Sequence, residues 1–278
     1  MSKVINPSLV ASVLALVFAC AAAAATPHTE RAVSGDWQAS FTYLQSTEYG
    51  LPSYSDLHLT VLHAGVLVLD APVTSSAAGS PSLGPGGFGA RPSISFRDLD
   101  ADGLPELLLL LYTGGAHCCF IDQVFDFSTR APNKSEINFA DSGAKLVRLG
   151  EKVLFESADE RFAYVFTDFA DSGAPLALWQ YQSERFVNVT REYPASIRAD
   201  AAFWWKTYRS RLKSSGDVRG FLSAWAADEA MLGVADRAKT TLLQIAFQGT
   251  LDNGIGGAKG STYVRALWKF LGKDGYVH

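Results

Sequence analysis

Short hydrophobic segments alternate with polar turns through the first two thirds of the chain, from Trp37 to about Tyr193. These segments are rich in aromatic and β-branched residues, which is the pattern of β-strands. Residues 74–91 are rich in Ser, Gly, Pro and Ala and predict a long surface loop. Strands are expected at residues 38–44, 57–69, 94–96, 107–112, 123–127, 145–149, 152–155, 162–166, 176–181 and 186–189.

A six-residue sequence, Phe-Ala-Asp-Ser-Gly-Ala, occurs twice, at residues 139–144 and 169–174. Each copy is followed by an apolar segment, a polar turn and a second apolar segment, which predicts a repeated β-hairpin. Repeats of this kind build blades or stacked sheets whose faces are buried by their neighbours. We therefore expect residues 26–193 to form a β-rich domain of the propeller-like or sandwich type.

After Pro194 the hydrophobic pattern changes to the 3.6-residue period of helices. Asp200 is expected to cap a first helix, and Asp217 to begin a second. A third is expected over residues 236–248, and a fourth between Ser261 and Gly272. Their aromatic stripes are expected to pack in a core, although a ligand slot is an alternative. The predicted fold class is α+β, with a C-terminal helical domain at residues 194–278.

The N-terminus has the pattern of an export signal over residues 1–25. Lys3 is followed by an apolar run over residues 9–18 and then by small residues. The run is shorter than the about 20 residues of a membrane-spanning helix, and no later segment is longer, so no transmembrane segment is expected. The mature protein is expected outside the cytoplasm, secreted or periplasmic. As an alternative, residues 17–20 resemble a lipobox, which would place a lipid anchor on Cys20.

The composition excludes a globally disordered chain, because 48% of the 278 residues are hydrophobic and 19% are charged. Lys and Arg number 24 against 28 Asp and Glu. This net charge of −4 argues against a nucleic-acid partner or an anionic membrane surface. Apart from Cys20, the cysteines are the neighbours Cys118 and Cys119. They could form a disulfide together, pair between chains, or stay buried as thiols.

Four carboxylates fall within nine residues, just before the apolar run at residues 107–111. If they converge, their repulsion requires a cation. Gly103 permits a sharp turn, and a set of hard oxygen ligands favours Ca²⁺ over Mg²⁺ or zinc. The alternative is a solvated acidic turn. The candidate ligands are the carboxylates of Asp98, Asp100, Asp102 and Glu106 and the carbonyl of Leu104.

The loop is not an EF-hand, because position twelve of that pattern is the apolar Leu109. It resembles instead the calcium loops of FG-GAP/VCBS repeats in integrin-type propellers, which bind Ca²⁺ through carboxylates at positions one, three, five and nine and a carbonyl at position seven. Residues 98–119, 159–164 and 185–190 further resemble a group of exported bacterial proteins that carry a VCBS-like loop. The resemblance implies calcium binding and a β-rich fold, and it implies no reaction. A second acidic loop would be expected just before Asp159, but residues 149–152 lack the ligands, so one site is expected.

The sequence contains no common nucleophile, zinc-protease or phosphate-loop motif. His117, beside the two cysteines, belongs either to a ligand-contacting rim loop or to a structural turn. The acid pairs Asp159–Glu160 and Asp168–Asp171 could serve a glycoside hydrolase. The favoured function is an exported calcium-binding module for an unknown protein or glycan ligand. A cell-envelope polysaccharide hydrolase is the alternative, and a purely structural envelope role is a third possibility.

Overall fold

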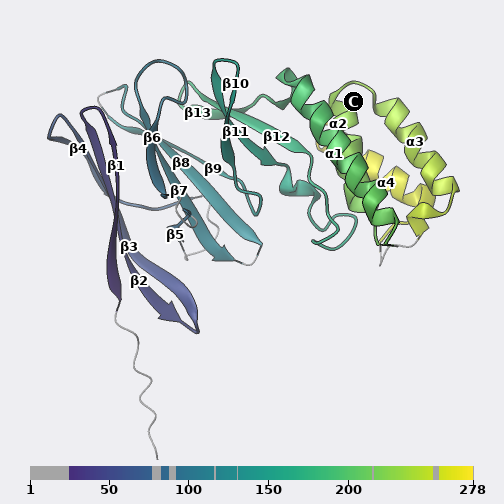
Figure 1. The fold of residues 1–278 in the computed structure, drawn as a ribbon, viewed down its shortest axis with the longest axis horizontal. Coiled ribbons are helices and arrows are strands. Elements are labelled where there is room, and N and C mark those ends of the chain that lie inside the picture. Colours follow the sequence, from purple (N-terminus) through teal and green to yellow (C-terminus); the bar gives the residue numbers. More distant parts are fainter. Residues whose placement is uncertain are drawn as a thin grey trace, which may run out of the picture.

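Three antiparallel sheets follow one another along the chain and are followed by four helices, as Figure 1 shows. The structure, a computed structural model, describes residues 25–76, 83–87, 92–115, 117–129, 131–214, 216–252 and 257–277. The α+β class is therefore confirmed. Within these residues the three sheets do not close into a propeller. Residues 1–24, which include Cys20 and nearly all of the predicted export signal, lie outside the described part of the chain.

The first sheet is a four-stranded meander in the order β1-β2-β3-β4. The single strand expected at residues 57–69 is wrong, because the chain turns within it. Ala64 and Gly65 both have positive φ angles, of 49° and 77°, and connect two antiparallel strands. The strands are β1 (Thr26–Ser34), β2 (Trp37–Glu48), β3 (Leu51–His63) and β4 (Val66–Pro72).

The second sheet has β7 near its centre and packs against the first sheet. Phe41 and Leu59 from the first sheet share a buried core with Leu109 and Ile121 from the second. The order is β5-β7-β8-β9, and β6 also pairs with β7. The strands are β5 (Gly84–Pro85), β6 (Ile94–Arg97), β7 (Glu106–Gly115), β8 (Cys118–Asp126) and β9 (Asn133–Asn138).

The third sheet consists of two hairpins in the order β10-β11-β12-β13, one after each copy of the repeated sequence. The repeated hairpin predicted from the sequence is thus confirmed. The strand expected at residues 162–166 is wrong. Phe162 ends a short 3₁₀ turn, and its ring packs edge-on against Phe270 and Tyr276 of the helical region. The strands are β10 (Lys145–Leu149), β11 (Lys152–Ala158), β12 (Leu176–Gln182) and β13 (Arg185–Asn188).

The four expected helices are present and pack beside the third sheet (Figure 1). The cap predicted at Asp200 is wrong. The first helix begins at Pro194, a position where the missing N–H costs nothing, and Asp200 lies inside it. No helix among the described residues is long and apolar enough to cross a membrane. The helices are α1 (Pro194–Leu212), α2 (Arg219–Met231), α3 (Ala235–Phe247) and α4 (Gly260–Lys273).

The aromatic stripes of the helices contribute to a core rather than to a slot. Tyr263, Val264, Leu267 and Leu271 of α4 are buried against the other helices, and Trp268 packs at the edge of the same cluster. Apolar burial of this kind is the main source of helix stability in a folded protein. The helices therefore share one hydrophobic core, to which Phe162 from the segment after β11 also contributes.

Candidate metal site

The acidic loop connects β6 and β7, which pair antiparallel with Arg97 opposite Glu106. Because these two residues are paired, the first and last residues of the loop lie close together. Ala101 and Gly103 adopt positive φ angles of 66° and 89°, which allow the chain to curl between the two strands. The pairing of β6 with β7 thus brings distant positions of the loop toward one centre.

Three of the four predicted carboxylates converge. Asp98, Asp100 and Glu106 each present one oxygen, and these oxygens all lie within 4.8 Å of one another. Two oxygens on opposite sides of one Ca²⁺ are about 5 Å apart, since each bond is about 2.3–2.6 Å long. The three side chains are therefore close enough to bind the same cation.

Asp102 does not belong to this cluster. Its carboxylate accepts a hydrogen bond of 2.7 Å from the backbone N–H of Leu104. Its own N–H donates to Asp100 Oδ1 over 3.2 Å. These bonds form the local turn that Asp residues favour in loops. The structure therefore gives Asp102 a role in shaping the loop, and a ligand role for the carbonyl of Leu104 stays a prediction.

Glu106 is the buried member of the cluster, with 2% of its surface exposed. The backbone N–H of Leu99 donates to its Oε2 over 2.6 Å. Burial is the main cause that raises the pKa of Glu106 to about 8, and the charges of Asp100 and Asp126 add to the shift. Burial also raises the pKa of Asp100. A buried carboxyl beside like charges must bind either a proton or a cation.

Asp126 is an acidic neighbour that the spacing of the loop does not indicate. It is the last residue of β8, and β8 pairs with β7 so that Phe125 lies opposite Leu107. This register places Asp126 beside Glu106, where its charge raises the pKa of Glu106. Its Oδ1 accepts a hydrogen bond from the N–H of Ser128. Strand pairing is the only signal that joins the two residues, and it is invisible in the spacing of the loop.

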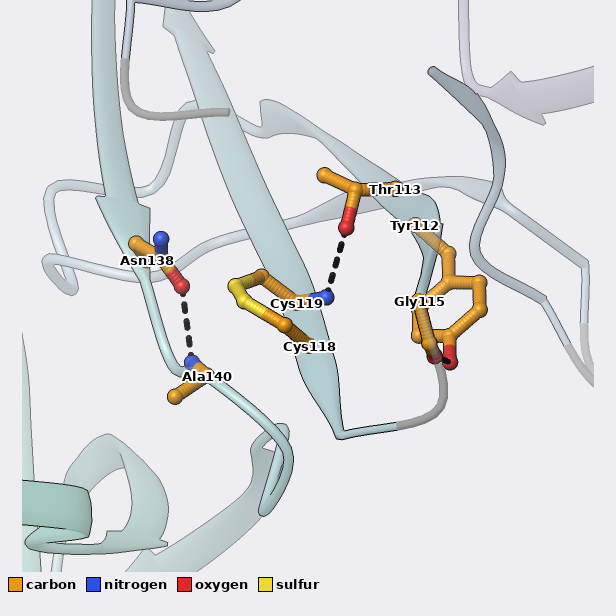
Figure 2. The surroundings of a disulfide bond; sticks show 7 residues. All are labelled: Tyr112, Thr113, Gly115, Cys118, Cys119, Asn138 and Ala140. Atoms are coloured by element: carbon orange, nitrogen blue, oxygen red, sulfur yellow. Dashed lines mark hydrogen bonds between the residues drawn. A yellow bond between two sulfur atoms is a disulfide. The ribbon is translucent and has the colours of Figure 1, made fainter. Parts of the chain in front are cut away.

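The two adjacent cysteines are joined in a disulfide, so the first of the three alternatives is the one present. Figure 2 shows the surroundings of this bond. The N–H of Cys119 donates to the hydroxyl of Thr113 over 2.7 Å, and the hydroxyl of Tyr112 donates to the carbonyl of Gly115. The segment is therefore held by hydrogen bonds on the β7 side.

His117 packs against aromatic rings from the second copy of the repeated sequence and from the turn before it. Its ring centroid lies 3.9 Å from that of Phe169 and 6.4 Å from that of Tyr164. These contacts connect the second sheet to the turn that precedes β12. They support the interpretation of the segment as a structural turn.

The acid pairs considered for glycoside hydrolysis are engaged by other side chains. Asp159 accepts hydrogen bonds from Arg161 and from the hydroxyl of Tyr276. Although burial acts to raise it, these bonds lower the pKa of Asp159, whereas a general acid needs a raised pKa. The carboxylate of Glu160 accepts from Ser142.

In the second pair, Asp171 forms an ion pair of 2.6 Å with Arg211. The side chain of Asp168 accepts a hydrogen bond of 2.9 Å from the backbone N–H of Asp171. Both carboxylates therefore stabilise the turn before β12 and its contact with α1. The hydrolase alternative stays a prediction, and the geometry of these two acid pairs does not favour it.

Comparison with known proteins identifies two relatives. The chain is 27% identical over 263 residues to a probable thylakoid lumen protein of Synechocystis sp., a match that covers 87% of this chain and 74% of that protein. It is 28% identical over 148 residues to an uncharacterized protein of Sinorhizobium fredii, which covers 50% of this chain and 23% of the relative. No protein-family model and no solved structure matches the chain. The FG-GAP/VCBS resemblance therefore stays a prediction.

Proposed function

We propose that this protein is an exported binding protein in which the loop between β6 and β7 holds one structural Ca²⁺. The observation that carries the proposal is the convergence of Asp98, Asp100 and Glu106, whose oxygens lie within 4.8 Å of one another. A bound cation would offset the repulsion among these carboxylates and the charge of Asp126. It would thereby fix the loop against the second sheet.

The chemistry of the donors favours calcium. All the converging atoms are carboxylate oxygens, which are hard ligands suited to Ca²⁺ and Mg²⁺. Neither histidine nor cysteine belongs to the cluster, and these are the residues that zinc and copper sites use. Ca²⁺ accepts irregular coordination, whereas Mg²⁺ demands a near-ideal octahedron. The resemblance of the loop to FG-GAP/VCBS calcium loops points to the same ion.

Two observations support a location outside the cytoplasm. The relative from Synechocystis is named a probable thylakoid lumen protein, and a lumen is separated from the cytoplasm by a membrane. The disulfide between Cys118 and Cys119 is typical of an oxidising compartment. Together with the pattern of residues 1–25, they support export. A lipid anchor on Cys20 remains the alternative to a freely diffusing secreted or periplasmic protein.

The metal site is tested by calcium titration of the EDTA-treated mature protein. Calorimetry and thermal unfolding are followed up to millimolar Ca²⁺, because extracellular sites are often that weak. We expect heat of binding and a rise in Tm with Ca²⁺, with a smaller response to Mg²⁺ at the same concentration. The absence of both heat and a Tm shift at millimolar Ca²⁺ would contradict the proposal.

A further inference from the structure

A cavity of about 970 Å³ lies where β9, the third sheet and the segment after α4 meet. Its volume is at the upper end of the range of about 300–1,000 Å³ that ligand sites occupy. One wall is aromatic and includes Phe139 and Trp179. A polar wall is formed by residues 159–161, Arg191 and residues 274–276. No residue of the acidic loop lines this cavity, so it is separate from the proposed calcium site.

The polar wall is held in place by its own contacts. Arg161 lies 3.0 Å from Asp274 and also pairs with Asp159. Arg191 donates to the carbonyls of Gly275 and Tyr276 over 3.0 and 3.2 Å. The side chains of Asp159 and Asp274 are only 12% and 16% exposed. A ligand would therefore meet donors and acceptors that are already fixed, which lowers the entropic cost of binding.

The charges of the lining disfavour an anionic ligand. Four carboxylates line the cavity, from Asp159, Glu160, Glu192 and Asp274, against two guanidinium groups. A phosphate or carboxylate ligand would face this excess of negative charge. A cationic ligand would compete with Arg161 for Asp159 and Asp274, to which that guanidinium is already paired. The wall is therefore best matched by an uncharged ligand with many hydroxyl groups.

The aromatic wall narrows the ligand class further. Trp179 is half-buried on β12 and lines the cavity, and the buried Phe139, which follows β9, also belongs to the lining. The C–H face of a sugar ring packs on an aromatic ring, while its hydroxyls both donate to carboxylates and accept from guanidinium groups. We propose that this cavity binds a short, neutral oligosaccharide between Trp179 and the Arg161–Asp274 pair.

The proposal is tested by calorimetric titration of the full mature protein with cellotriose, maltotriose and chitotriose, and with an anionic trigalacturonate. We expect at least one neutral trisaccharide to bind and the anionic one not to bind. Trp179→Ala should weaken binding at least tenfold. The matched control is Trp268→Ala, a half-buried tryptophan of α4 outside the cavity, which should leave the affinity unchanged.

A second variant keeps the test interpretable if Trp179→Ala does not fold. Ala158 lines the cavity at the end of β11, so Ala158→Phe should fill part of it and weaken binding at least tenfold while circular dichroism stays unchanged. Binding should persist in EDTA, because the site does not depend on the proposed calcium ion. Failure of all neutral trisaccharides to bind, preference for the anionic one, or binding unaffected by both variants would overturn the proposal.

Discussion

The hydroxyl of Tyr276 donates a hydrogen bond of 2.6 Å to Asp159, although the two residues are 117 positions apart in the chain. Asp159 follows β11 in the third sheet, whereas Tyr276 lies in the segment after α4. Arg161 strengthens this link by pairing with both Asp159 and Asp274. The end of the chain thus fixes the helices to the third sheet and forms one wall of the cavity.

Tyr276→Phe removes this hydrogen bond while keeping the ring that packs on Phe162. We expect the free energy of unfolding to fall by about 1.5–3 kcal/mol, the usual contribution of a hydrogen bond to a charged group. Urea denaturation measures the change. Tyr49→Phe is the control, because Tyr49 is fully exposed and removal of its hydroxyl should leave the free energy of unfolding unchanged. Equal stability of both variants would show that the contact does not hold the C-terminal segment.

Arg219, the first residue of α2, connects that helix to the segment before α4. Only 1% of its surface is exposed. It pairs with Asp217 over 2.6 Å and donates to the carbonyl of Ala258 over 2.8 Å. Arg219→Met should cost about 3–5 kcal/mol in unfolding free energy, because it leaves the carboxylate of Asp217 buried without its cation. Lys145→Met is the contrast, since Lys145 pairs with Glu156 over 2.6 Å and the two side chains are 63% and 31% exposed.

The expected cost of Lys145→Met is at most about 1 kcal/mol, as for other exposed ion pairs. The double variant Asp217→Asn with Arg219→Met should be more stable than Arg219→Met alone, because no unpaired charge remains. Chemical denaturation of the three variants gives the comparison. Similar losses for Lys145→Met and Arg219→Met would contradict the interpretation that burial sets the difference.

Much of the fold follows from local patterns. The alternation of apolar residues located most strands, and the repeated six-residue sequence located the two hairpins of the third sheet. The errors arise where tertiary contacts outweigh those patterns. Phe162 has the neighbours of a strand residue, yet its ring packs against α4. Asp200 has a favourable type for a helix cap, yet it lies within α1 and accepts hydrogen bonds from Leu176 and Trp204.

The candidate sites also contain some residues that the sequence spacing indicates and others that only the tertiary structure brings together. Asp98, Asp100 and Glu106 are close in sequence, so spacing was enough to bring them together. Asp126 comes from the next strand, and its approach to Glu106 depends on strand register. The walls of the cavity come from segments between residues 137 and 276 and meet only in the folded chain. No local sequence pattern could have indicated this cavity.

Asp228 gives a pH dependence that can be measured. It is fully buried in α2, and burial, with the charge of Asp200, raises its pKa to about 10 from an ordinary value of 3.8. Between these values the folded protein holds a proton that the unfolded chain releases, so stability falls as pH rises. Asp228→Asn removes this dependence. The free energy of unfolding of the variant, relative to that of the native protein, should therefore increase by up to about 1.4 kcal/mol for each unit that the pH rises.

Urea denaturation at pH 5 and pH 8 checks this expectation. The control is Asp236→Asn, which removes an exposed carboxylate at the start of α3 instead of the buried one. If Asp228→Asn gained no more at pH 8 than at pH 5, Asp228 would not be protonated in the folded protein.

We expect the acidic loop to contain calcium ligands and one residue, Asp102, that mainly shapes the turn. In Asp100→Asn and Glu106→Gln the rise in Tm with Ca²⁺ should be lost or reduced by at least half, because each change removes a converging charge. Asp102→Asn should respond nearly as the native protein does, since an asparagine oxygen can still accept the hydrogen bond from Leu104. Thermal unfolding with and without Ca²⁺ measures all three.

Glu106→Gln carries a further signature that distinguishes a lost ligand from a damaged fold. Without Ca²⁺ the raised pKa of about 8 leaves the Glu106 carboxyl mostly protonated at pH 7, so a neutral amide in its place should leave the protein about as stable as the native form. With Ca²⁺ the native protein should become the more stable of the two. A native protein that gains no more from Ca²⁺ than Glu106→Gln does would place the ion, if it binds at all, away from this loop.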